Sequence, residues 1–116
     1  DFSACPGNTN SLLVLDTRNI NDVKHKEEIA MSSPYGMTIK DNELYVGEGD
    51  NGLKIFDISD KYNPDLIRTI ENIKAYDVIT HPTNSDLILT TGPEGVSQYI
   101  VNENGESLTL QSSISY

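Results

Sequence analysis

Asn51-Gly52-Leu53-Lys54-Ile55-Phe56-Asp57 repeats, 41 positions later, the pattern of Asn10-Ser11-Leu12-Leu13-Val14-Leu15-Asp16. The correspondence continues downstream, where Tyr76 follows the second copy at the distance at which Tyr35 follows the first. A weaker copy opens at Gly95-Val96-Ser97-Gln98-Tyr99-Ile100. Repeats of about 40–45 residues that consist of short strands and turns are typical of β-propeller blades. The sequence therefore predicts an all-β chain whose blades have four antiparallel strands.

Short apolar runs separated by turn residues give the expected strands. No stretch shows the helical period. The predicted blades occupy residues 35–74 and 75–116, and a partial blade occupies residues 1–34, so that 1–116 is one propeller segment. The expected strands are 12–16, 24–29, 35–39, 43–47, 53–58, 66–70, 76–80, 86–91, 96–101 and 107–113. The apolar runs at 44–46 and 87–89 suit inner strands that are buried on both faces.

The length of the chain raises the question of how the ring is completed. A closed propeller needs about four to eight blades, and 116 residues at about 40 per blade provide about two and a half. Each blade buries its faces against its neighbours, so a short arc leaves apolar surface open. We expect the missing blades to come from a longer chain or from homo-oligomerisation.

The charge of the chain narrows the range of partners. The sequence has 18 acidic and 8 basic residues, a net charge of −10. Such a surface repels polyanions, which argues against nucleic acid and anionic lipid. No apolar run reaches the roughly 18 residues of a membrane span, so no membrane insertion is expected. Cys5 is the one cysteine, and Phe2-Ser3-Ala4-Cys5 weakly resembles a lipoprotein cleavage site; a lipid anchor at Cys5 and a plain strand residue both remain open.

The second copy of the repeat also points to a family. Residues 52–60, Gly-Leu-Lys-Ile-Phe-Asp-Ile-Ser-Asp, followed by Asn63-Pro64, resemble the LVIVD repeat. The first copy is weaker, since Val23 stands where Pro64 stands in the second, and the copy after Val96 lacks the aspartate. The resemblance implies a bacterial, extracytoplasmic propeller (periplasmic, surface or secreted) with no general enzymatic activity.

The aspartates that end the repeated strands have a predicted structural role. Asp16 and Asp57 each end a strand and open a turn, where a carboxylate accepts backbone N–H groups. Every blade needs such a turn, so a repeated aspartate is expected to be part of the scaffold. Pro64 fixes the backbone in the same turn of the second copy.

Four residues are candidates for ligand binding. Tyr35 and Tyr76 occupy equivalent positions at the entry to the first strands of successive blades, near the channel where propeller ligands commonly bind. A tyrosine suits sugars and peptides alike, although packing between blades is the competing explanation. Asp77 and His81 are four residues apart in a strand and would face the same way, which makes a channel-facing His–Asp pair conceivable.

Calcium is the one cofactor that the sequence suggests. Glu48, Asp50 and Asn51 bring oxygen ligands to a glycine-rich turn, but hairpin turns commonly hold such residues. No catalytic residues are assigned. The sequence favours a noncatalytic module that binds a protein or a carbohydrate. A lactonase- or lyase-like propeller enzyme, and a lectin assembled from few-blade subunits, remain as alternatives.

Overall fold

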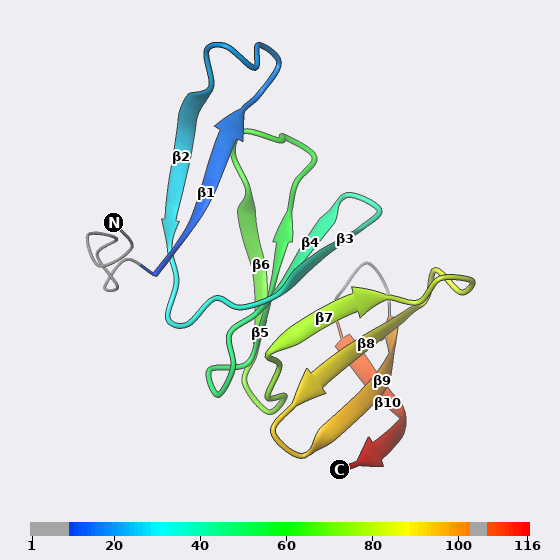
Figure 1. The fold of residues 1–116 in the computed structure, drawn as a ribbon. Helices are drawn as coiled ribbons and strands as arrows, with labels where there is room; N and C mark the ends of the chain where they lie inside the picture. The colour runs from blue at the N-terminus through cyan, green and yellow to red at the C-terminus, as the bar shows by residue number, and fades with distance from the viewer. Residues whose placement is uncertain (1–9, 103–106) are drawn as a thin grey trace.

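The computed structural model describes residues 10–102 and 107–116, and over these residues the chain is all-β (Figure 1). The strands form three antiparallel sheets. Within the described ranges no helix is present that is long and apolar enough to cross a membrane. Cys5 lies outside the described residues.

Two four-stranded sheets and one two-stranded sheet follow one another along the chain. The N-terminal hairpin comprises β1 (Ser11–Asp16) and β2 (Lys24–Ala30). The second sheet has the order β3-β4-β5-β6, with β3 (Met37–Lys40), β4 (Glu43–Gly47), β5 (Leu53–Asp57) and β6 (Asp65–Ile70). The third has the order β10-β9-β8-β7, with β7 (Asp77–Thr80), β8 (Leu87–Gly92), β9 (Gly95–Asn102) and β10 (Ser107–Ser115). These sheets are propeller blades, and the chain is an arc of about two and a half blades.

The repeat is visible in the pairing of the strands. Leu12 pairs with Ile29 across β1 and β2, and Leu53 pairs with Ile70 across β5 and β6. The N-terminal hairpin is therefore the outer half of a blade, equivalent to β5 and β6. The turn that precedes β5 uses Gly52, which has φ 102° and whose Cα faces the carbonyl oxygen of Ile70 so closely that a Cβ would clash.

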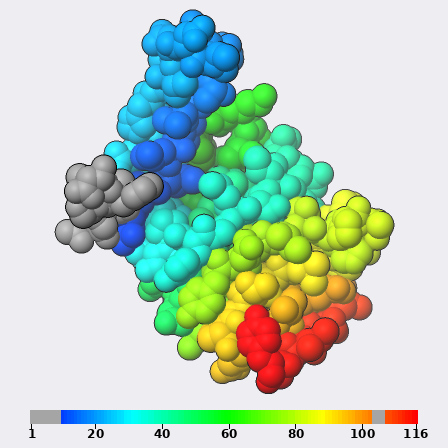
Figure 2. All heavy atoms as spheres, viewed as in Figure 1, coloured from blue at the N-terminus to red at the C-terminus, as the bar shows by residue number. Residues whose placement is uncertain are grey.

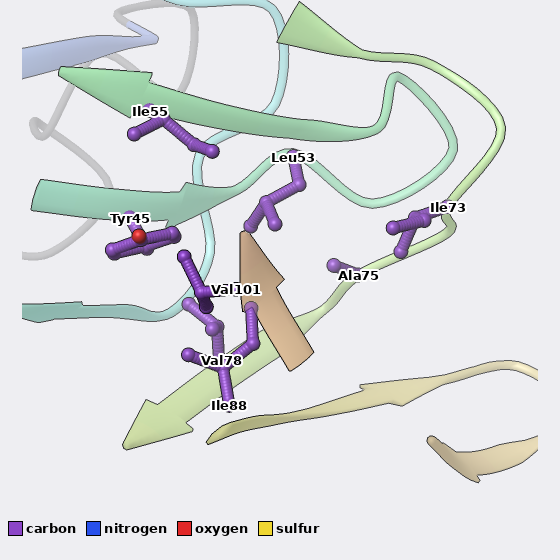
Figure 3. Close-up of a cluster of buried hydrophobic side chains, with 8 residues drawn as sticks. All are labelled: Tyr45, Leu53, Ile55, Ile73, Ala75, Val78, Ile88 and Val101. Carbon is purple, nitrogen blue, oxygen red and sulfur yellow. The ribbon is translucent and has the colours of Figure 1, made fainter. Parts of the chain in front are cut away.

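The sheets stack through alternating side chains of the inner strands. Tyr45 of β4 points toward the third sheet, where it is fully buried with Val78 and Ile88, as Figure 3 shows. Its neighbours Leu44 and Val46 point the other way. They pack with residues of the N-terminal hairpin and of β5, namely Leu12, Met31 and Phe56. All five residues of β4 are buried, as expected for a strand between two neighbouring blades.

The first strands of the two complete blades lie side by side. β3 contacts β7, and the amide of Gly36 donates a hydrogen bond of 3.0 Å to the carbonyl oxygen of Tyr76. Both strands are the edge strands of their sheets. The first strand of each blade therefore lies at the shared inner edge of the arc.

Both ends of the described arc present an open face. On the N-terminal side, Met37 and Ile39 of β3 are 58% and 60% exposed. They line an apolar groove of about 490 Å³ beside β1, visible in Figure 2 as the hollow between the blue hairpin and the neighbouring sheet. On the C-terminal side, Ile88 of β8 is fully buried, whereas Leu87 and Leu89 are only half-buried. The expectation that this run is buried on both faces is wrong here, because no further blade covers the outer side of β8 among the described residues.

Candidate functional site

Tyr35 and Tyr76 form an aromatic pair across the boundary between the two complete blades. Their ring centroids are 5.3 Å apart with an interplanar angle of 84°, an edge-to-face contact. Gly49 lies beneath them, since a Cβ there would stand 2.8 Å from Tyr35 Cε2 and 3.1 Å from Tyr76 Cε1. Tyr76 is half-buried, whereas Tyr35 is 63% exposed. Packing between the blades therefore explains the half-buried position of Tyr76, whereas Tyr35 remains largely exposed to solvent.

Asp77 adjoins the tyrosine pair. Its side chain lies over Gly36, where a Cβ would clash with the Asp77 carboxylate. The carboxylate also accepts a hydrogen bond of 2.8 Å from the amide of Val78, and the residue is exposed. Three of the four predicted ligand-binding residues, Tyr35, Tyr76 and Asp77, therefore come together at the start of β3 and β7.

His81 does not join them. Asp77 opens β7 and His81 follows its last residue, so four residues of extended chain, about 13 Å, separate the two. The imidazole Nδ1 instead accepts hydrogen bonds from the amides of Thr83 and Asn84, at 3.3 and 3.1 Å. The hypothesised His–Asp pair is therefore not formed, and His81 shapes the turn between β7 and β8.

The three residues considered for calcium have different surroundings. Glu48 is fully buried, and its Oε1 accepts the amides of Ser32 and Ser33 at 2.7 and 3.2 Å. Its Oε2 lies 3.0 Å from Lys54 Nζ, an ion pair that is not aligned as a hydrogen bond. Asp50 is on the surface, 3.7 Å from Lys74 Nζ.

Because Glu48 is buried and accepts the amides of Ser32 and Ser33, it holds the segment that leads into β3. Asn51 lies in the exposed turn next to Asp50. Over the described ranges, no group of three or more His, Cys, Asp or Glu side chains is arranged to hold a metal ion. Calcium binding by Glu48, Asp50 and Asn51 remains a prediction from the sequence.

The repeated aspartates have the predicted turn role. Asp57 accepts the amide of Ser59 at 2.8 Å, and Asp16 accepts the amide of Arg18 at 3.1 Å. Asp16 also holds the Arg18 guanidinium, with 2.6 Å between Oδ2 and Nη2. These hydrogen bonds from Arg18, above all those from its side chain, lower the pKa of Asp16 to about 2. The scaffold role of both aspartates is confirmed.

A pocket that the sequence did not suggest lies near the tyrosine pair. It has a volume of about 270 Å³ and opens between the segment 72–74, which connects β6 to β7, and the strands β8 and β9. Lys74, which forms part of its wall, is ion-paired with Asp50 in the loop that also carries Gly49. The pocket and the tyrosine pair are thus connected through this loop.

The second sheet is similar to a known repeat family. Residues 36–71, which cover β3 to β6, match the family model of the LVIVD repeat. The chain contains an LVIVD repeat. The matched residues include the second copy of the repeat, on which the resemblance was based. They also include β3 and β4, the first two strands of the same blade. No curated protein matches the chain.

One solved structure has a similar fold. It is the crystal structure of a functionally unknown protein from Desulfotomaculum acetoxidans DSM 771, with a TM-score of 0.74 at 12% sequence identity. The match covers 92% of this chain and 36% of that chain. At this identity the similarity concerns the fold alone. The chain spans about a third of the length of that structure.

Proposed function

We propose that the chain is part of a noncatalytic, extracytoplasmic propeller that binds a protein or a carbohydrate at the face carrying Tyr35 and Tyr76. The observation that carries the proposal is the tyrosine pair itself. Tyr35 is 63% exposed, and its ring is held in place by Tyr76 and by the Gly49 turn. A rigid aromatic with a polar tip is a common anchor for both classes of ligand.

The surroundings of the pair support binding rather than catalysis. Asp77 is the acidic side chain beside it, and its carboxylate accepts the amide of Val78. His81, the residue best suited to acid–base chemistry, belongs to the turn at the other end of β7. A catalytic site here would need acid–base groups from blades beyond the described residues.

The proposal includes further blades in the same polypeptide. Within the described residues, β1 and β2 form the outer half of a blade whose inner half is not present. Strands from a longer chain would complete it. The open groove beside β1 and the exposed Met37 and Ile39 are consistent with such a completion.

The test is a binding screen with matched tyrosine variants. The chain is applied to a glycan array and to a displayed peptide library, alongside Tyr35→Ala and the control Tyr116→Ala, whose side chain is 84% exposed at the C-terminal end. We expect Tyr35→Ala to weaken binding at least about 10-fold, as for an interface anchor, and Tyr116→Ala to bind like the parent. Equal binding by Tyr35→Ala and the parent would reject the tyrosine site.

A further inference from the structure

The register of the strands allows the two complete blades to be compared position by position. Val46 pairs with Lys54 in the second sheet, and Thr90 pairs with Ser97 in the third. The amide of Tyr35 bonds to Gly47, and that of Tyr76 bonds to Thr91. It follows that Thr90 corresponds to Val46, Ser97 to Lys54, and Gly92 to Glu48.

In the second sheet, two long side chains stand at the positions that correspond to Gly92 and Ser97. Glu48 and Lys54 occupy the space between the connecting segment and the sheet, where the carboxylate holds the amides of Ser32 and Ser33. Glu48 is fully buried, and the Lys54 side chain is 18% exposed. The space is therefore closed by an internal ion pair.

In the third sheet, the space that corresponds to the Glu48–Lys54 ion pair is a pocket. Gly92 and Ser97 replace the glutamate and the lysine, and both line the pocket of about 270 Å³. The connecting segment has moved closer as well, because a Cβ at Gly92 would clash with the carbonyl oxygen of Lys74. Because the Lys74 carbonyl lies so close to Gly92, no side chain fits at position 92 to fill the pocket.

We propose that this pocket binds a single neutral sugar unit. Its lining includes three residues that carry a hydroxyl group, Thr90, Ser97 and Tyr99, and the amide-bearing Asn72. Hydroxyl groups donate and accept hydrogen bonds, and an amide offers both functions side by side. This set matches the hydroxyl groups of a sugar, while the half-buried ring of Tyr99 offers an apolar surface for its C–H face.

The size and the charge of the pocket favour a small neutral ligand. A volume of about 270 Å³ is at the lower limit for drug-sized molecules and suits one small ring. An anion would meet Glu94 at the rim, and Lys74, the cation of the wall, is already paired with Asp50 at 3.7 Å. A purely apolar ligand would bury the polar side chains of this lining, such as Ser97 and Asn72, without giving them hydrogen bonds.

This inference rests on the proposed binding function and specifies its ligand as a carbohydrate. The Lys74–Asp50 ion pair joins the pocket wall to the loop beneath the tyrosine pair. A sugar unit in the pocket and an exposed ring at Tyr35 would then contact one extended glycan at two points. The two sites are tested separately, because a monosaccharide occupies only the pocket.

The experiment follows backbone amide signals by NMR while glucose, galactose, mannose or N-acetylglucosamine is titrated into the chain. We expect at least one of these sugars to shift the amides of residues 72–74 and 92–97 saturably. Ser97→Lys places the side chain of the preceding blade in the pocket and should abolish the shifts. Ser85→Lys adds the same charge in an exposed turn and should leave them unchanged.

A second variant keeps the result interpretable if Ser97→Lys disturbs the fold. Thr90→Val introduces the residue that the second sheet has at this position, and it should weaken binding about fivefold through the lost hydrogen bond. Absence of saturable shifts with all four sugars, or unchanged binding by both pocket variants, would reject the sugar pocket. The tyrosine site would survive that result if glycan or peptide binding still depended on Tyr35.

Discussion

Among single residues, the buried carboxylate of Glu48 departs most from what the sequence pattern predicts. Glu48 has the surroundings of a core residue, although it follows a strand and precedes a glycine turn in which an exposed side chain is expected. Its carboxylate accepts two amides of the preceding connection and forms an ion pair with Lys54. A buried ion pair contributes little net stability by itself, but removal of one partner is strongly destabilising. Glu48 therefore fixes the entry of the chain into β3.

Glu48→Gln is expected to destabilise the chain by about 3 kcal/mol, because Lys54 then keeps a charge without a partner in a mostly buried site. Urea unfolding followed by circular dichroism measures the loss. The double variant Glu48→Gln/Lys54→Met should recover most of it, since the unpaired charge is gone. A double variant no more stable than the single one would contradict this role of the ion pair.

The turn aspartate of the first copy gives a prediction of pH dependence. The pKa of Asp16 is lowered to about 2 in the folded chain, so the folded state binds this proton less tightly than the unfolded state. Its stabilising contribution is present above the ordinary pKa of about 4 and is lost as the pH falls from about 4 to about 2. Arg18→Ala should return the pKa of Asp16 toward about 4.

A carboxyl ¹³C NMR titration of the parent and of Arg18→Ala measures this shift. Asp57 is the internal control, because the amide and side chain of Ser59, and not an arginine, lower its pKa. The Asp57 titration should therefore be the same in both proteins. An Asp16 pKa that stays near 2 without Arg18 would show that another group lowers it.

At the scale of strands and turns, the first and second copies of the repeat are alike in pairing but not in backbone conformation. Gly52 has φ 102°, whereas Ser11 at the equivalent position does not have a positive φ. Gly52→Ala should therefore destabilise the chain by about 1–3 kcal/mol through backbone strain and the approach of the Ile70 carbonyl. Ser11→Ala should change the stability by less than about 0.5 kcal/mol. Thermal unfolding of both variants checks the contrast, and equal effects would contradict it.

The pairing of β4 with β5 also places two carboxylates opposite each other, Glu43 and Asp57. Burial is the main reason that the pKa of Glu43 is raised, and its Oε2 has no hydrogen-bond partner within the described structure. The folded state then binds this proton more tightly than the unfolded state, so its stability rises as the pH falls through the raised pKa.

Glu43→Gln should for this reason stabilise the chain at neutral pH and reduce the difference in stability between neutral and mildly acidic solution. Urea unfolding at two pH values measures both effects. Asp65→Asn, an exposed carboxylate at the start of β6, is the control and should change neither. A loss of stability in Glu43→Gln at neutral pH would contradict the cost assigned to its burial.

The strands could be predicted because their signals are local. Turn residues such as Asp41–Asn42 and Gly49–Asp50 bound the runs that form β3, β4 and β5, and the bounds agree within one or two residues. The bulges could not be predicted, for example the register shift between Ile55 and Phe56, because they arise from the pairing with a second strand. The pocket at Gly92 and Ser97 could be recognised only once the register had related them to Glu48 and Lys54.

The whole molecule is an arc with two unlike open faces. The N-terminal face exposes Met37 and Ile39 beside the free edge of β1, and the C-terminal face exposes Ile79 and Ile114, at 52% and 74%. Apolar faces of this kind are interaction surfaces in proteins that stay soluble.

Faces that differ at the two ends favour head-to-tail contact, which continues from copy to copy unless the ring closes. We therefore expect the isolated chain to self-associate with rising concentration in sedimentation velocity experiments. Ile39→Lys on one face and Ile79→Lys on the other should each reduce the association, because every head-to-tail contact uses both faces. If only one substitution had an effect, the contact would instead join two copies of the same face, and a chain that stayed monomeric at every concentration would show that the open faces do not drive assembly.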